Sequence, residues 1–442
     1  MQRARTLDEA RKVLDPRPLV FGTEEPNRGD KAASASEFYT EPPAQKKGNR
    51  KLPSPVENIR QRLLTGPDDT KLFLCGHVGS GKSTELNRLA VDSEITSMFS
   101  VVMLRFEEQE WATLDSSQVL FRIAGEIYVR FKPLLAKSSN TELQKALGEL
   151  NDRLVGVTGL RATEGSIGVE LDLVVFKVKQ ELKLSEKARR VFREFGETQQ
   201  TLLQDVLREL VDAVENALAT TEEPPRLLVL ADDMDKVRGV EQQKEMFDKN
   251  LAALTSPQVR IVYTLPTGVY FGENRADVRQ NVEYLYPVRV LNKAASGSFN
   301  PEDAYTPERI GFFEALVHHR VEEDLIALEA TRLAAIYSGG VLRDFFHLLR
   351  EGIRLARYNK LDVLDVELMR YAIDDARLRE SAGLYAPDYE ALAFVHKTNE
   401  LRTVDDRRYL DTSRVLECYN GSVWFETTPL LWQLLEKRAS HA

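Results

Sequence analysis

Short, almost continuously apolar runs alternate with helical patterns from residue 71 onward. Five of these runs have the length of strands: 71–75, 100–106, 226–232, 260–266 and 284–291. Runs of this kind are typical of strands buried on both faces, as in a parallel sheet covered by helices. The pattern therefore predicts an α/β fold with a parallel sheet of about five strands flanked by helices.

The second and third predicted strands are separated by over one hundred residues, more than a single crossover requires. Leucines at helical spacing predict a helix over 143–154, and alternating apolar and polar residues predict a half-buried hairpin over 166–184. A long amphipathic helix begins near Leu202. We interpret 107–200 as an insertion, which is either a partner-binding lobe or a structural one.

Helical periodicity dominates after residue 300. It predicts helices over 307–328, 330–337, 341–358 and 363–380, which we interpret as a helical lid domain spanning 300–384.

Residues 385–442 have a different pattern. Asn420-Gly421 lies between two β-prone runs and predicts a tight hairpin, with helical patterns before and after it. Helices combined with a hairpin predict a winged-helix-like module, and a small α+β cap on the helical domain is the alternative.

Residues 1–60 form an N-terminal segment that we expect to be partly extended, because it is rich in Pro, Gly, Ser and Lys. Thr6 and Glu9 predict a capped helix at its start. Two apolar islands, 19–21 and 38–39, are expected to pack on the protein surface or, alternatively, against an adenine ring.

Composition narrows the class of protein. The chain has 442 residues, a net charge of −9 and two cysteines, which excludes a disulfide framework. No apolar run approaches the roughly 18 residues that span a bilayer, and the first residues lack the apolar stretch of a signal peptide. We therefore expect a cytoplasmic protein without membrane contact.

The chemically most informative motif is GHVGSGKST at 76–84, a complete G-x-x-x-x-G-K-[ST] phosphate loop between a predicted strand and a predicted helix. Its glycines let backbone N–H groups face phosphate oxygens at a helix N-terminus. Lys82 is expected to reach the β- and γ-phosphates, and Ser83 to bind Mg²⁺. The expected nucleotide-binding residues are Gly76, Val78, Gly79, Ser80, Gly81, Lys82, Ser83 and Thr84. We assign 61–299 to this ATPase domain, and ATP is the expected nucleotide because no N-K-x-D motif ends a strand.

Paired acids end the third predicted strand. Asp232 is expected to hold Mg²⁺ through water opposite Ser83, and Asp233 to orient or polarise the attacking water. Many ATPases carry a longer glutamate there, so slow turnover is expected. The alternative is a solvated acidic turn. Asp235 and Lys236 either pair locally or reach a neighbouring subunit.

Two further residues are candidates for the γ-phosphate. Thr264 ends the fourth predicted strand; in a P-loop sheet where that strand lies between the first and the third, its hydroxyl reaches the phosphate or the water, as could that of Thr267. Capping of a turn is the alternative. Arg343 follows two glycines and lies in the first turn of a helix, where a cation is unfavourable, which suggests a role on the phosphate.

These motifs resemble the additional-strand ATPases of the AAA+ and STAND groups, in particular replication-initiator-like, transposition-regulator-like and bacterial defence-associated members. The resemblance rests on 76–84, 228–236, 262–266 and 338–344. It implies that Thr264 takes the sensor-1 position and Arg343 the sensor-2 position. It also implies an arginine finger at Arg275 or Arg279.

The resulting hypothesis is an ATP-hydrolysing molecular switch that controls self-assembly or a separate effector protein, and the resemblance suggests a role in bacterial anti-phage defence. The alternative is a DNA-binding ATPase that acts as a replication initiator or transposition helper, with phosphates contacted by Arg402, Arg407, Arg408 and Arg414. Aspartates interleaved with these arginines favour a solvated face instead. A small-molecule kinase is a third, weaker alternative.

Overall fold

The computed structural model describes residues 3–21, 35–44, 46–47, 50–112, 114–136, 141–146, 148–149, 198, 200–237, 239–271, 280–293, 298–419 and 421–439. The chain forms two compact units, each assembled from separate stretches of sequence. We call residues 58–74 with 89–283 the sheet unit. We call residues 1–57, 75–88 and 284–442 the lid unit. The four predicted domain segments stay a prediction.

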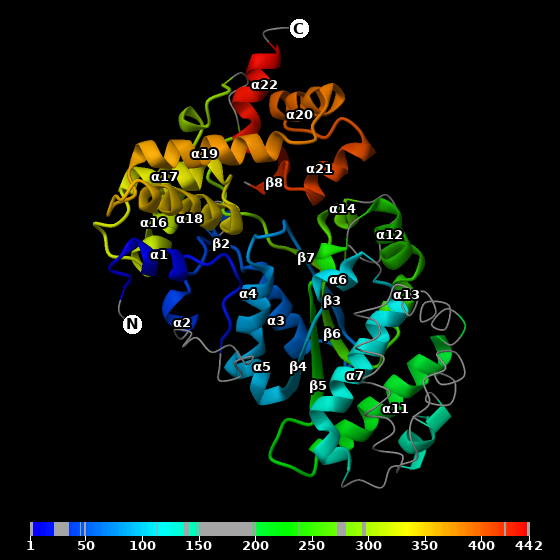
Figure 1. Ribbon diagram of the computed structural model, residues 1–442. Coiled ribbons are helices and arrows are strands. Elements are labelled where there is room, and N and C mark those ends of the chain that lie inside the picture. Colours follow the sequence, from blue (N-terminus) through cyan, green and yellow to red (C-terminus); the bar gives the residue numbers. More distant parts are fainter. Residues whose placement is uncertain are drawn as a thin grey trace. The chain divides into compact units, whose positions relative to one another are not determined.

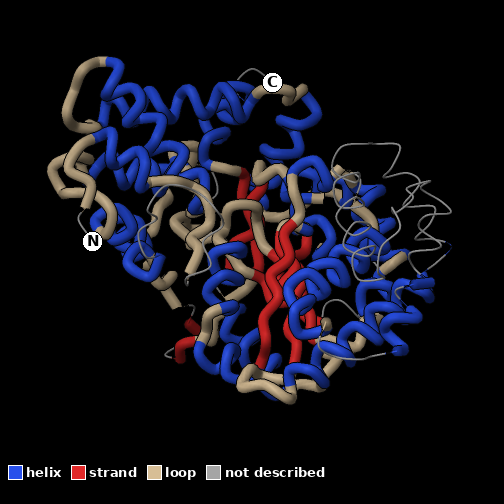
Figure 2. The backbone as a smooth tube through the Cα atoms, turned by 60° about the horizontal axis from the view of Figure 1, so that its bottom comes forward, coloured by secondary structure: helices blue, strands red, loops and turns tan. Residues whose placement is uncertain are grey.

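Five strands form one parallel sheet flanked by helices, which confirms the predicted fold class (Figures 1 and 2). Its order is β4-β5-β6-β3-β7, so β6 lies between β3 and β5 as the P-loop arrangement requires. Every residue of β3 and β6 is buried, which explains why all of them except Lys71, Arg260 and Thr264 are apolar. The strands are β3 (Lys71–Cys75), β4 (Phe99–Arg105), β5 (Arg226–Asp232), β6 (Arg260–Leu265) and β7 (Val282–Tyr284).

The fifth strand differs from its prediction. It covers only Val282–Tyr284 rather than 284–291, because the chain passes into the lid unit at Tyr284 and Pro287 has no N–H to donate to a ladder. Its apolar residues Val290 and Leu291 are instead buried in the hydrophobic core of the lid unit.

Helices of the sheet unit pack on the strands and on one another. The long helices α7 (Ser116–Leu135) and α11 (Gln200–Leu218) contact each other and also β4 and β5, respectively. Helix α11 confirms the amphipathic helix predicted near Leu202. The predicted hairpin at 166–184 and most of the predicted helix at 143–154 lie outside the described residues. The other helices are α3 (Pro55–Thr65), which starts in the lid unit, α5 (Ser93–Met98), α6 (Glu108–Trp111), α12 (Val240–Lys244), α13 (Leu251–Thr255) and α14 (Thr267–Tyr270).

The lid unit is mainly helical, and one predicted helix in it is wrong. The chain over 307–328 is helical only to His318, because the following residues form bridges instead: Val321 pairs with Ala4, and Ile326 with Leu364. The remaining predicted helices are present with shifted ends. The helices are α1 (Leu7–Val13), α2 (Ala35–Phe38), α4 (Lys82–Ala90), whose last residues enter the sheet unit, α16 (Pro307–His318), α17 (Leu328–Tyr337), α18 (Leu342–Tyr358) and α19 (Val366–Ser381); a two-residue ladder joins β1 (Lys46–Lys47) and β2 (Arg50–Lys51).

The C-terminal part of the lid unit contains the predicted hairpin between helices. Strands β8 (Val415–Tyr419) and β9 (Val423–Thr427) pair antiparallel, with Tyr419 opposite Val423. Gly421 in the connecting loop has φ +101°, a conformation that favours glycine. This arrangement of helices and hairpin is winged-helix-like, and its helices are α20 (Ala386–Thr398), α21 (Arg408–Asp411) and α22 (Trp432–Ala439).

Candidate nucleotide site

The phosphate-loop motif has the local structure that its chemistry needs. It follows β3 and leads into α4, which begins at Lys82. Gly76, Gly79 and Gly81 have φ values of +146°, +93° and +108°, where an L side chain is strained. Glycine at these positions therefore permits the curled backbone that the motif predicts.

Polar groups of this loop are largely buried. The Nζ of Lys82, a residue that is 4% exposed, donates to the carbonyls of Gly76 and His77 at 2.6 and 2.8 Å. The Ser80 hydroxyl is buried, and no described residue gives it a hydrogen-bond partner. Ser83 lies in the first turn of α4, beside Lys82. A buried hydroxyl and a lysine at a helix N-terminus fit the binding of a phosphate group.

The predicted γ-phosphate arginine lies next to this loop. Arg343 is the second residue of α18, and its backbone N–H donates to the carbonyl of Gly79 at 3.2 Å. A Cβ added at Gly79 would lie 2.5 Å from the Cβ of Arg343, so the contact also requires the glycine. The structure thus brings Arg343 to the loop through its backbone, within the lid unit.

The N-terminal segment packs along α4. The N–H of Leu19 donates to the Thr84 hydroxyl at 3.2 Å, and its carbonyl accepts from the Asn87 amide at 2.6 Å. The Tyr39 hydroxyl donates to Glu85 at 2.8 Å, and the Phe21 ring meets the Tyr39 ring edge-on. Each apolar island therefore contacts the helix that follows the phosphate loop, one through Leu19 and the other through Tyr39.

The acidic turn lies in the sheet unit at the end of β5. Asp232 is 1% exposed, and its Oδ1 accepts the N–H of Asp233 at 2.8 Å. Thr264, which is fully buried, accepts the N–H groups of Met234 and Asp235 at 2.9 and 3.3 Å. Thr264 therefore holds the turn that follows the two acids. β5 and β6 run parallel, so these groups collect at one edge of the sheet.

Electrostatics around Asp233 are set by three neighbours. Asp233 adopts a left-handed conformation, with φ +69°, and forms an ion pair with Lys236. The ammonium of Lys236 also lies 4.6 Å from the centre of the Trp111 ring. Burial raises the pKa of Asp233, the charge of Asp235 adds to this, and Lys236 and Arg105 oppose it. A buried carboxyl with a raised pKa is a frequent property of catalytic acids and bases.

The predicted site residues thus form two groups. The residues 76–84 and Arg343 come together in the lid unit, and Asp232, Asp233 and Thr264 come together in the sheet unit. Arg275 and Arg279 lie outside the described residues. Sequence reasoning missed the hydrogen bond of His77, which occupies a variable position of the motif. It also missed Trp111. Lys236 forms its ion pair with Asp233, three residues away, and not the predicted pair with the adjacent Asp235.

The predicted Mg²⁺ would have few protein ligands. Among the described residues, no three His, Cys, Asp or Glu side chains converge on a point where a metal could bind. A magnesium ion on a nucleotide needs only one or two protein ligands besides phosphate and water. Ser83 and Asp232 supply ligands of the type that Mg²⁺ prefers, so the donor set fits this ion.

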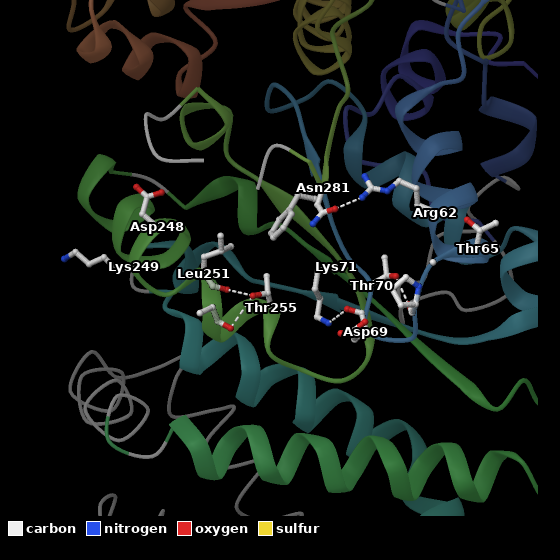
Figure 3. Close-up of a pocket in the computed structure, with 14 residues that line it drawn as sticks. Arg62, Thr65, Asp69, Thr70, Lys71, Asp248, Lys249, Leu251, Thr255 and Asn281 are labelled. Atoms are coloured by element: carbon white, nitrogen blue, oxygen red, sulfur yellow. Dashed lines mark hydrogen bonds between the residues drawn. The ribbon is translucent and has the colours of Figure 1, made fainter. Parts of the chain in front are cut away.

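A cavity in the sheet unit, about 720 Å³ in volume, lies elsewhere (Figure 3). It is lined at the start of β3, the end that is remote from the phosphate loop, by residues that include Arg62, Lys71 and Asn281. The Nζ of Lys71 donates to the carbonyls of Asp69 and Pro257, both at 2.6 Å, and burial lowers the pKa of Lys71 to about 8. None of the predicted site residues lines this cavity.

The parallel sheet, its strand order, the phosphate loop and the acid-ended strand together fit the fold of a P-loop ATPase of the AAA+ class. No protein-family model and no curated protein matches the chain. Among described residues, no helix is both long and apolar enough to cross a lipid bilayer.

Comparison with solved structures returned proteins of similar length and low sequence identity. The ORC2 protein of Aeropyrum pernix is 12% identical, with 92% of this chain and 98% of that chain covered and a TM-score of 0.39. For Cdc6p of Pyrobaculum aerophilum the identity is 13%, the coverage 92% and 98%, and the TM-score 0.37. Drosophila ORC bound to DNA is 12% identical, with 94% of this chain and 96% of that chain covered and a TM-score of 0.36. At this degree of likeness, function has to be inferred from the residues of this chain. The expected role in anti-phage defence and the expected effector protein gain no support.

Proposed function

We propose that the chain is a switch that binds Mg–ATP through its phosphate loop and hydrolyses it slowly. The observation that carries the proposal is the conformation of the loop. Three glycines at positive φ curl the backbone between a buried strand and the N-terminus of α4. Such a loop exposes N–H groups and a partial positive charge to phosphate oxygens.

In this proposal each predicted residue has a definite role. Lys82 would bind the β- and γ-phosphates, while Ser83 and Asp232 would hold Mg²⁺. Asp233 orients the attacking water, and Thr264 keeps the turn that carries it in place. Arg343 neutralises charge on the γ-phosphate. Magnesium supplies charge stabilisation for the phosphoryl group.

Slow hydrolysis follows from two features of Asp233. Its side chain is one methylene shorter than the glutamate of many ATPases, and its carboxylate is paired with Lys236. This ion pair opposes the rise in pKa that burial causes, so Asp233 is a weaker base than an unpaired carboxylate would be at this buried position. A switch that keeps its nucleotide for a long time is therefore favoured over a motor with rapid turnover. Assembly into a homo-oligomer would be the output of this switch.

The decisive experiment is nucleotide binding by Lys82→Ala. We expect calorimetry to show that Mg–ATP affinity falls by at least about 100-fold, because a buried charge-assisted contact to phosphate is lost. Lys249→Ala is the matched control, since Lys249 is exposed and pairs only locally with Glu245. Undiminished binding by Lys82→Ala would refute the proposal. Phosphate release without an added acceptor excludes the kinase alternative.

A second candidate function is DNA binding by the same ATPase, favoured by the winged-helix-like arrangement of α20, α21 and the β8–β9 hairpin. One of the solved structures above is Drosophila ORC bound to DNA. Three of the four predicted phosphate-contacting arginines are paired inside the lid unit: Arg402 with Asp406, Arg408 with Asp388 and Arg414 with Glu380, at 3.8, 2.8 and 3.2 Å.

Duplex DNA affinity measured across salt concentrations tests this candidate. Each phosphate that is neutralised adds about −0.9 to the slope of log affinity against log salt. A slope near zero, or no binding, would mean that the arginines keep their internal partners. A slope of −3 or steeper, lost in Arg402→Ala and Arg407→Ala, would support DNA binding.

A further inference from the structure

His77 lies inside the phosphate loop and bonds to the C-terminal hairpin. Its Nε2 accepts the backbone N–H of Glu417 at 2.7 Å, from a residue 340 positions later in the chain. His77 is fully buried, and burial, followed by the charge of Lys82, lowers its pKa to about 3. The ring is therefore neutral, and since Nε2 accepts, the proton resides on Nδ1.

This hydrogen bond gives the Glu417 N–H, on the edge of β8 that faces away from β9, its acceptor. Glu417 pairs with Phe425 of β9, whose own N–H donates to the carbonyl of Asn399 rather than across the hairpin. The Glu417 N–H likewise points away from β9, and as a buried donor it requires an acceptor. The imidazole of His77 takes the place that a third strand would occupy.

Two further contacts join the hairpin to segments around the phosphate loop. A Cβ added at Gly339 would lie 2.3 Å from Leu416 of β8, so the turn that leads to Arg343 presses on the hairpin. The Tyr419 ring stacks on Tyr286, with centroids 5.2 Å apart. The turn at 338–343 thus touches both the phosphate loop and β8, all within the lid unit.

The docked hairpin also buries an acid. The Glu417 side chain is 0% exposed, and no described residue gives its carboxyl oxygens a geometrically good hydrogen bond. Burial raises its pKa to about 8, and the nearby Tyr284 hydroxyl lowers it only in part. A buried acid weakens the docked arrangement, because the undocked carboxyl would gain hydration and charge. The free energy that holds the hairpin in place is therefore small, because the cost of burying the Glu417 carboxyl offsets part of the gain from the docking contacts.

Lys82 connects this contact to the nucleotide. Its ammonium donates to the carbonyl of His77, in the same residue whose ring holds β8. A triphosphate that recruits Lys82 removes one donor from the His77 carbonyl, which keeps the Ser80 N–H, at 3.1 Å, as a donor. The peptide that follows His77 is then held less tightly. Movement of that peptide displaces the ring from the Glu417 N–H.

We propose that the β8–β9 hairpin senses the nucleotide through His77, so that occupancy of the phosphate loop loosens the C-terminal module. The inference rests on the proposed function, since it takes the phosphate loop as the nucleotide site. Binding linkage is reciprocal. A ligand that prefers the released module therefore raises the affinity for the nucleotide, and the nucleotide raises the affinity for that ligand by the same factor.

Hydrogen exchange over 415–419 in the full chain, with and without Mg–ATP, tests the inference. We expect Mg–ATP to speed exchange there about tenfold. Without nucleotide, His77→Leu should produce a similar increase, because a buried N–H loses its acceptor. His77→Gln should stay close to the parent, since its side-chain oxygen reaches the position of Nε2. Tyr419→Leu, which leaves the loop sequence intact, should show a smaller increase.

The outcomes separate this inference from the proposed function. If Mg–ATP binds by calorimetry and leaves exchange over 415–419 unchanged, the inference is wrong and the nucleotide site stands. If His77→Leu and Tyr419→Leu both exchange like the parent, the hairpin is not held as described. If Mg–ATP does not bind at all, the proposed function fails, and the inference fails with it.

Discussion

The phosphate loop and the acidic turn are supported in opposite ways. The loop is held by residues far away in the chain: Gly79 contacts Arg343, and His77 contacts Glu417. The acidic turn is held by Lys236, three residues away, and by Thr264 on the adjacent strand. In the proposed function, the first arrangement lets distant parts of the lid unit influence nucleotide binding, whereas the second keeps the support of the proposed hydrolytic residues within the sheet unit.

The largest expected effect comes from a substitution that removes the carboxylate proposed to act in hydrolysis. Asp233→Asn should lower the hydrolysis rate by about 10² to 10³-fold, because a neutral amide cannot polarise the water. Mg–ATP affinity should stay within about threefold, since the phosphate loop is unchanged. Single-turnover kinetics and calorimetry measure the two quantities. Asp205→Asn on α11 is the control, since the carboxylate of Asp205 is partly exposed and pairs locally with Arg208. Hydrolysis at the parent rate would show that Asp233 is not the water-orienting residue.

The second prediction concerns the glycine turn that supports the phosphate loop. Gly340 has φ +87°, and an added Cβ would lie 1.8 Å from the carbonyl oxygen of Val288. Gly340→Ala should therefore lower the free energy of unfolding by more than about 3 kcal/mol, since backbone must move. Gly383 has φ +77° with nothing within 4 Å. Gly383→Ala should cost only the strain of the left-handed conformation, about 1 kcal/mol.

Thermal unfolding of the two alanine variants provides the measurement. Equal losses would mean that the turn at 338–340 tolerates displacement, and that the close contact with Val288 does not constrain it.

Elements whose causes are local could be predicted from the sequence, and elements that depend on distant residues could not. The strand 71–75, the phosphate loop and the β8–β9 hairpin follow from periodicity and turn residues, because their causes lie within a few positions. The predicted strand 284–291 and helix 307–328 failed because distant residues compete for the same groups, as Ala4 does for Val321. The partner of His77 lies 340 residues away, beyond any local pattern.

Thr264→Val probes the local support of the acidic turn. Valine has nearly the same shape and cannot accept the two N–H groups that Thr264 receives, so we expect a loss of about 2 kcal/mol in stability and slower hydrolysis. Thr264→Ser keeps the acceptor and should lose less. Urea unfolding followed in both variants decides the point. A valine variant as stable as the serine variant would show that these two N–H groups find other partners.

The smallest expected effect is a change in pH dependence through Lys236. Burial raises the pKa of Asp233 above its ordinary value of 3.8, and Lys236 opposes this. Because the folded-state pKa is raised, the contribution of Asp233 to stability is complete below pH 3.8 and is lost as the pH rises through the folded value. Lys236→Met removes the opposing charge, so the pKa of Asp233 should rise further.

Since only the ionised carboxylate assists the water, the acidic limb of the hydrolysis profile should shift to higher pH by the same amount. Lys236→Arg retains the charge and should leave the limb near its parent position. Nucleotide affinity should not follow the shift, because the acidic turn is supported separately from the phosphate loop. A limb that stays fixed in Lys236→Met would mean that the ion pair does not set the protonation of Asp233, and an equal shift in affinity would mean that the two regions are not independent.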